Sequence, residues 1–177
     1  MQTREQERAQ RSWEALTADD RFGEGLHIPL EPAEGQTESE ASKKQRTRAK
    51  QYLNGLNRTA ASIYVAGLGQ ALAFLWARHK KIEAYGDVGT DLSSLVLKHL
   101  AGPVHEGQPA PEALLGKIRD DDIWTLMMAT EEALGLISWL KRYLEGAGVE
   151  PEDPDAAAET EDVGGDADAR NAPAEAN

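Results

Sequence analysis

The feature that most constrains the fold is an uncharged stretch of nineteen residues, Thr59–Ala77, closed by Arg58 and Arg78. About 20 apolar residues are enough to cross a bilayer as a helix. A helix that is apolar nearly all round is also typical of the centre of a water-soluble bundle. Gln70 and six alanines dilute the large apolar residues here, and Gln70 would place its amide in hydrocarbon. We therefore expect a buried core segment rather than a membrane span.

Two glycines near the middle of this stretch, Gly67 and Gly69, each cost about 1 kcal/mol of helix propensity relative to alanine. Close approach of a neighbouring helix is the simplest compensation, because the surrounding residues are small as well. A local break in the helix at this point is the alternative.

The rest of the chain also has helical periodicity, with apolar residues three and four apart. We expect helices over residues 3–16, 42–55 and 58–81, another from residue 86 to the Gly102–Pro103 stop, a short one after Pro111, and a last one from about 120 to 146. No run alternates with period two for long enough to propose a sheet. The fold class predicted is all-α, a compact bundle of about five to seven helices.

The last predicted helix has well-marked ends. Asp120, Asp121 and Asp122 precede it, where carboxylates can cap free N–H groups and meet the positive end of the helix dipole. A metal site is the alternative for this triplet, and we favour the cap. Residues at the 3–4 spacing of the helix are Ile123, Met127, Thr130, Leu134, Ile137, Leu140 (or Lys141) and Leu144, and these form its expected apolar face.

Net charge is unevenly distributed along the sequence. The whole chain carries −12, but residues 150–177 hold ten acids against the single base Arg170, which leaves −3 for residues 1–149. With one valine and no aromatic, this acidic segment cannot bury enough apolar area to become ordered. We expect a helical domain over residues 1–148, with a long loop or insertion at 17–40, and a disordered acidic C-terminal tail over 149–177. The tail is either a mimic of nucleic-acid charge or a solvated extension.

Catalytic signatures are missing from the sequence. It has no cysteine, so disulfides, thiolate metal sites and a catalytic thiol are excluded. Its four histidines form no HExxH pattern, and GLGQAL at residues 67–72 lacks the third glycine of a dinucleotide fingerprint. We therefore expect a protein that is not an enzyme and has no metal or cofactor. The charged start, without an apolar stretch behind it, favours a cytoplasmic location.

Basic residues are the remaining candidates for function, and they fall in three clusters. Residues 42–58 contain the densest one and hold no acid. Together the clusters consist of Lys43, Lys44, Arg46, Arg48, Lys50 and Arg58, then Arg78, Lys80 and Lys81, then Lys141 and Arg142. Arrayed positive charge suits a phosphate backbone, and an ordinary solvated face is the alternative. Composition alone does not separate the two.

Two stretches resemble a known family. GLGQALAFLWA (residues 67–77) and EALGLISWLKRYLE (residues 132–145) are similar to the signature stretches of the small α-helical subunit of type III-B CRISPR effector complexes, the Cmr family. The matching residues are Gly67, Leu68, Gln70, Leu72, Ala73 and Phe74, then Trp139, Leu140, Lys141, Arg142 and Tyr143. The resemblance spans about residues 1–148. Ala66 stands where the family usually has a polar residue, and the acidic tail has no counterpart.

The resemblance implies a non-catalytic role in antiviral defence. Such subunits stack along a ribonucleoprotein filament with copies of themselves and other subunits, and support the duplex of guide RNA and target RNA through backbone contacts. The eleven basic residues above then become the candidate RNA contacts, while Trp139 should be a core or subunit contact. The alternative is a protein–protein assembly module that does not touch RNA.

Overall fold

The computed structural model describes residues 2–28, 39–100 and 108–151, and this part of the chain contains helices and no strand. The elements are α1 (Arg4–Thr17), η1 (Glu24–Leu26), α2 (Glu40–Ala66), α3 (Leu68–Arg78), α4 (Glu83–Leu100), α5 (Ala110–Asp120) and α6 (Ile123–Gly146). The predicted all-α class is confirmed, and six α-helices among the described residues agree with the expected number. The acidic segment beyond residue 151 and the expected stop at Gly102–Pro103 lie outside these residues.

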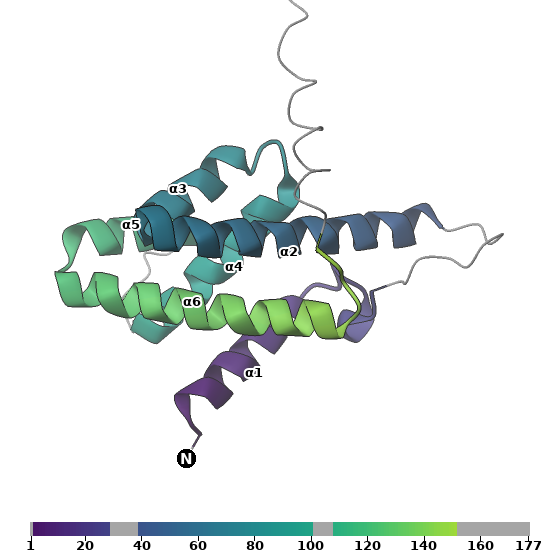
Figure 1. Ribbon diagram of the computed structural model, residues 1–177, viewed down its shortest axis with the longest axis horizontal. Coiled ribbons are helices and arrows are strands. Elements are labelled where there is room, and N and C mark those ends of the chain that lie inside the picture. Colours follow the sequence, from purple (N-terminus) through teal and green to yellow (C-terminus); the bar gives the residue numbers. More distant parts are fainter. Residues whose placement is uncertain (1, 29–38, 101–107, 152–177) are drawn as a thin grey trace, which may run out of the picture.

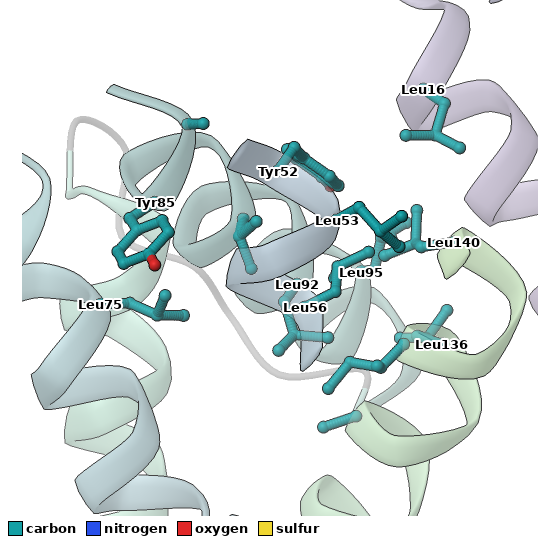
Figure 2. Close-up of a cluster of buried hydrophobic side chains, with 14 of the residues drawn as sticks. Leu16, Tyr52, Leu53, Leu56, Leu75, Tyr85, Leu92, Leu95, Leu136 and Leu140 are labelled. Carbon is teal, nitrogen blue, oxygen red and sulfur yellow. The ribbon is translucent and has the colours of Figure 1, made fainter. Parts of the chain in front are cut away.

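The two longest helices, α2 and α6, run antiparallel across the molecule (Figure 1). α4 packs on both of them, α3 folds back against α2, and α1 lies on α6. Figure 2 shows Leu53 beside Leu140 and Leu56 beside Leu136, with Leu92 and Leu95 of α4 completing the layer. Burial of each leucine stabilises the fold by about 1.5–3 kcal/mol, so this leucine layer fixes the register of the three helices.

The uncharged stretch is divided between two helices. The expected helix over 58–81 is wrong in its bounds: α2 continues through Gly55 to Ala66, and Gly67 then breaks the chain with φ +87° and ψ 165°. The alternative of a local break was therefore the right one. Within the described helices, no segment combines the length and hydropathy that a membrane span needs.

Burial of this stretch is also less complete than expected. Ile63, Leu68 and Leu72 lie in the core, but Tyr64 is 77% exposed and Val65 88% exposed at the end of α2. The last turn of α2 therefore leaves two large side chains of the stretch in contact with solvent.

Glycine roles differ from those the sequence suggested. A Cβ added at Gly67 would meet no atom within 4 Å, so this glycine serves the backbone turn and not close packing. Close packing occurs at Gly55, where a Cβ would lie 3.1 Å from both the Tyr85 ring and the Val88 side chain. The expected end of a helix at Gly55 is thus a point of close helix contact.

The start of α6 confirms the predicted cap. The Asp122 carboxylate accepts a hydrogen bond from the Thr125 backbone N–H at 2.9 Å. Asp120 and Asp121 pair instead with Arg119 and Lys117, at 2.7 Å and 2.8 Å. The expected apolar face of α6 is wrong at its first turns, because Ile123 is 63% exposed and Met127 is 56% exposed.

Buried ion pairs attach α1 to α6. The Arg8 guanidinium lies 2.8 Å from the carboxylate of Glu132, which is only 1% exposed, and Arg4 pairs with the same carboxylate at 3.2 Å. Gly135 makes room for this contact, since a Cβ there would lie 2.7 Å from the Arg8 guanidinium carbon. The glycine in EALGLISW is therefore required by the position of α1.

Residues 18–28 return the chain from α1 to the bundle. Phe22 is fully buried with its ring edge-on to Tyr52 at 5.2 Å between centroids, and Leu26 and Ile28 are buried beside it. Arg21 reaches the Asp91 carboxylate at 2.7 Å. The first part of the expected loop at 17–40 is therefore packed against the bundle, and residues 29–38 lie outside the described part.

Candidate RNA-binding face

The first half of α2 concentrates positive charge. Ser39 caps this helix by accepting a hydrogen bond from the Ser42 N–H at 3.1 Å, so the basic run begins in its first turns. Between Lys43 and Arg58 the helix holds six bases and no acid. A regular helix over this run spreads the charges along about 22 Å, at 1.5 Å per residue.

Helical spacing directs most of these bases away from the core. Lys43, Arg46 and Lys50 stand at i, i+3 and i+7, on one side of the helix. Tyr52 and Leu56, both fully buried, lie on the side opposite Lys43, whereas the buried Ala49 and Leu53 border Arg46. Lys43 and Lys44 are exposed, and Arg46 and Lys50 are partly exposed. We call the surface formed by Lys43, Lys44, Arg46 and Lys50 the basic face.

Arg48 has a different role within the same run. Its guanidinium lies 2.7 Å from the Asp87 carboxylate and 3.1 Å from that of Glu83, both on α4. These two acids offset its charge inside the fold. Arg48 therefore holds α2 against α4, and its removal would leave Asp87 with the more distant Arg21, at 3.8 Å, as its partner.

A cavity of about 530 Å³ adjoins the basic face. Lys43 and Lys44 line it from α2, and Glu83 lines it from the start of α4. Lys80 and Lys81 are exposed in the turn that immediately precedes Glu83. The first two predicted clusters thus approach each other at this end of the bundle.

The other predicted bases lie elsewhere. Arg58 is further along α2, and the Arg78 guanidinium stacks over the Phe74 ring at 4.7 Å. Lys141 follows Leu140, which lies beside Leu53 of α2 (Figure 2). Arg142 turns toward α1 instead, with its guanidinium 5.1 Å from the Trp139 ring.

Arg142 belongs to an aromatic group between α1 and α6. It lines a cavity of about 690 Å³ together with Trp13 and Tyr143. Trp139 is half-buried here, and its indole N–H donates to the Glu5 carboxylate at 2.9 Å. Trp139 therefore makes its contacts within this chain, with α1 and with its own helix.

Behind the basic face lies a buried polar cluster. The Asp91 carboxylate accepts hydrogen bonds from Arg21 at 2.7 Å and from the Tyr52 hydroxyl at 2.8 Å. Burial raises the pKa of Asp91 to about 6, against the opposing effect of Arg21. Burial and the nearby Asp91 also raise the pKa of Tyr52 well above its ordinary value. These hydrogen bonds connect Arg21 and α2 to α4, and so fix the position of the helix that carries the basic face.

The opposite end of the molecule is apolar, which the sequence did not predict. The C-terminal end of α2 and the N-terminal end of α6 both lie at this end of the molecule (Figure 1). Exposed side chains gather on these two helix ends: Tyr64, Val65, Ile123, Trp124, Met127 and Met128. A cavity of about 710 Å³, lined by Gly67, Leu115 and Leu126 among others, adjoins them. We call this surface the apolar end.

An apolar patch of this kind marks a protein interaction site more often than a solvated surface. Sequence periodicity could not reveal it, because Ile123 and Met127 continue the core spacing of α6. The one available signal was Trp124, which lies outside that spacing beside an apolar neighbour.

A helical body with a basic face toward one end and an apolar surface at the other defines a binding or assembly subunit. The model of the family described as CRISPR-associated protein (Cas_Cmr5) matches residues 36–147. The chain belongs to this family, the small subunits of type III-B CRISPR complexes. No curated protein and no solved structure matches the chain. The matched span runs from just before α2 to the end of α6, so α1 and the acidic segment lie outside it.

Proposed function

We propose that this subunit supports the duplex of guide RNA and target RNA in a type III-B complex, through sequence-independent contacts between the basic face and phosphates. It does so as a non-catalytic member of a cytoplasmic antiviral complex. Base pairing reads the sequence in RNA-guided systems, and the protein contacts the backbone. Rows of lysine and arginine are suited to that task.

The observation that carries this proposal is the acid-free run on α2. Six bases fall within sixteen residues, and Lys43, Arg46 and Lys50 share one side of a regular helix. A solvated helix face more commonly alternates bases with acids at i, i+4, which stabilises it by about 0.3–0.5 kcal/mol per pair. The run from Lys43 to Arg58 contains no acid for such pairs, which favours a polyanionic partner.

The apolar end supplies the protein contacts of the same proposal. The two helix ends expose large apolar side chains, among them Trp124, Met127 and Val65, whose contact with water is unfavourable. We propose that another subunit, or a further copy of this chain, covers this end in the assembled filament. The basic face then lies free of the protein contact, because the two surfaces belong to opposite ends of α2.

Crosslinking tests the RNA contact in the assembled complex. Target RNA carrying photoreactive uridines is annealed to the guide, irradiated, and the crosslinked peptides are mapped. We expect crosslinks within residues 42–58 and in the turn at 79–82, and none in residues 123–128. Crosslinks confined to the apolar end, or none in this subunit, would contradict the proposal.

A second candidate is an assembly module that touches no RNA, and the apolar end is the observation that favours it. Charging this surface separates the two candidates. Trp124→Asp with Met127→Lys should release the subunit from the complex under either hypothesis. Replacement of the basic face should weaken RNA retention without releasing the subunit only if the RNA proposal holds.

A further inference from the structure

We propose that the acidic segment, residues 150–177, binds the basic face of α2 and competes there with RNA. The segment is thus an internal substitute for the phosphate backbone. The competition rests on the proposed function, whereas the contact between segment and face does not.

Charge complementarity is the first argument. The segment carries ten acids and one base, a net charge of −9. The helix run from Lys43 to Arg58 carries six bases and no acid. Lys43 and Lys44 are exposed in the first turns of α2, where the segment's carboxylates would meet them.

The point of departure of the segment is the second argument. Val149 is 4% exposed, and its N–H donates to the Leu144 carbonyl at 3.0 Å, so the chain is held against the bundle up to the start of the segment. Figure 1 shows the end of α6 and the beginning of α2 at the same end of the molecule. The segment therefore starts at the same end of the molecule as the first turns of α2, and at the other end from the start of α6.

Reach is the third argument. After Pro151 the sequence continues for 26 residues, which span up to ~85 Å when extended. Lys43 and Lys50 are separated by only ~10 Å along the helix. A tethered ligand acts at an effective concentration in the mM range. The acidic segment would therefore occupy the basic face for much of the time even if its intrinsic affinity were weak.

The competition would make RNA binding selective for extended polyanions. A short or isolated phosphate group cannot displace ten tethered carboxylates, whereas a long duplex can offer more charges at once. Because the family match ends at residue 147, this control lies outside the part of the chain that the family model covers.

A spin label tests the contact without RNA. The chain has no cysteine, so Ala167→Cys gives a unique attachment point. In the full chain we expect the label to broaden the amide resonances of residues 43–50 and to leave those of residues 123–128 sharp. The matched control has the ten acids replaced by asparagine and glutamine and should lose the broadening. Equal broadening at both ends, or none, overturns the contact.

Affinity for a double-stranded RNA of mixed sequence tests the competition. Neutralising the ten acids should raise the affinity of the full chain by about tenfold or more. A second background has Lys43, Lys44, Arg46 and Lys50 changed to glutamine, which removes the basic face. Neutralising the ten acids in this background should change the affinity for RNA by less than about twofold. An equal gain in both backgrounds indicates general repulsion and overturns the proposal.

The two experiments separate this proposal from the proposed function. Loss of label contact together with intact RNA binding overturns the role of the segment alone. Label contact at the basic face, with no RNA binding by the neutralised chain, overturns the competition and the proposed RNA contact together.

Discussion

Gly67 and Gly69 show how two neighbouring glycines serve different purposes. Gly67 has φ +87° and ψ 165°, a region that is essentially restricted to glycine. Gly69 lies inside α3, where an added Cβ would make ordinary contact with Ile118 at 3.6 Å. Sequence reasoning identified the cost of both residues but could not separate them, because backbone conformation at a break depends on tertiary packing.

This difference gives a matched pair of variants. Gly67→Ala should destabilise the fold by about 1–3 kcal/mol, since alanine is strained at this φ. Gly69→Ala should stabilise it by up to about 1 kcal/mol through helix propensity. Urea unfolding followed by circular dichroism measures both. A tolerated Gly67→Ala would mean that α2 and α3 can join without the break.

The buried carboxyl of Asp91 gives a pH-dependent prediction. Its folded-state pKa, about 6, lies above its unfolded value. The folded state therefore binds this proton more tightly, and stability from this group is lost as pH rises from about 4 to about 6. A shift of two units corresponds to about 3 kcal/mol.

Asp91→Asn removes this titration while retaining an acceptor for the Tyr52 hydroxyl. The free energy of unfolding of the native chain minus that of the variant should therefore decrease between pH 4 and pH 6.5, by about 2–3 kcal/mol. Chemical denaturation at several pH values measures it. A difference that rises with pH would show that Arg21 outweighs burial and lowers the pKa instead.

At the scale of elements, local signals located most helices. The start of α6 follows from Asp122, and α1 and α5 have bounds within a few residues of those expected. The boundary between α2 and α3 lies at Gly67 and not at Gly55, although a glycine at either position can end a helix. Gly55 instead lets α2 approach Tyr85 and Val88. Glycine serves both at helix ends and at close helix contacts, and only tertiary packing decides which role a given glycine has.

The attachment of α1 depends on one buried carboxylate. Glu132→Gln removes the charge that faces Arg8 and Arg4 and should cost about 2–3 kcal/mol, because the buried Arg8 guanidinium loses its buried counter-ion and keeps the exposed Glu5 and Glu131 as partners. Glu131→Gln is the matched control: Glu131 pairs with Arg4 at 3.1 Å, but its side chain is 64% exposed. Such exposed pairs contribute little.

Hydrogen exchange of the α1 amides locates this effect. In Glu132→Gln these amides should exchange faster than those of α2 and α4, since α1 would open separately from the leucine layer. Uniform acceleration across all helices, or equal effects of the two variants, would show that α1 is held by other contacts.

At the scale of the whole molecule, the basic face was predictable and the apolar end was not. An acid-free run on a helix must present most of its bases outward, because buried unpaired charge is costly. No comparable rule applies to apolar residues, whose spacing is the same whether a neighbouring helix or a partner covers them. Arg48 shows the limit of the rule, since its guanidinium pairs with Asp87 inside the fold.

The central claim is that the basic face holds RNA phosphates, and the salt dependence of RNA retention by the assembled complex tests it most directly. The variant changes Lys43, Lys44, Arg46 and Lys50 to alanine and keeps Arg48, whose loss would disturb α4. The matched control changes Lys98 and Lys117 to alanine, on α4 and α5.

Each phosphate contact contributes about 0.7 to the slope of log affinity against log salt for single strands and about 0.9 for a B-form duplex. Loss of four contacts in each subunit should therefore flatten the slope by about 3 to 4 per subunit, with the subunit still in the complex and the control slope unchanged. An unchanged slope in the variant, or equal flattening in the control, would contradict the account.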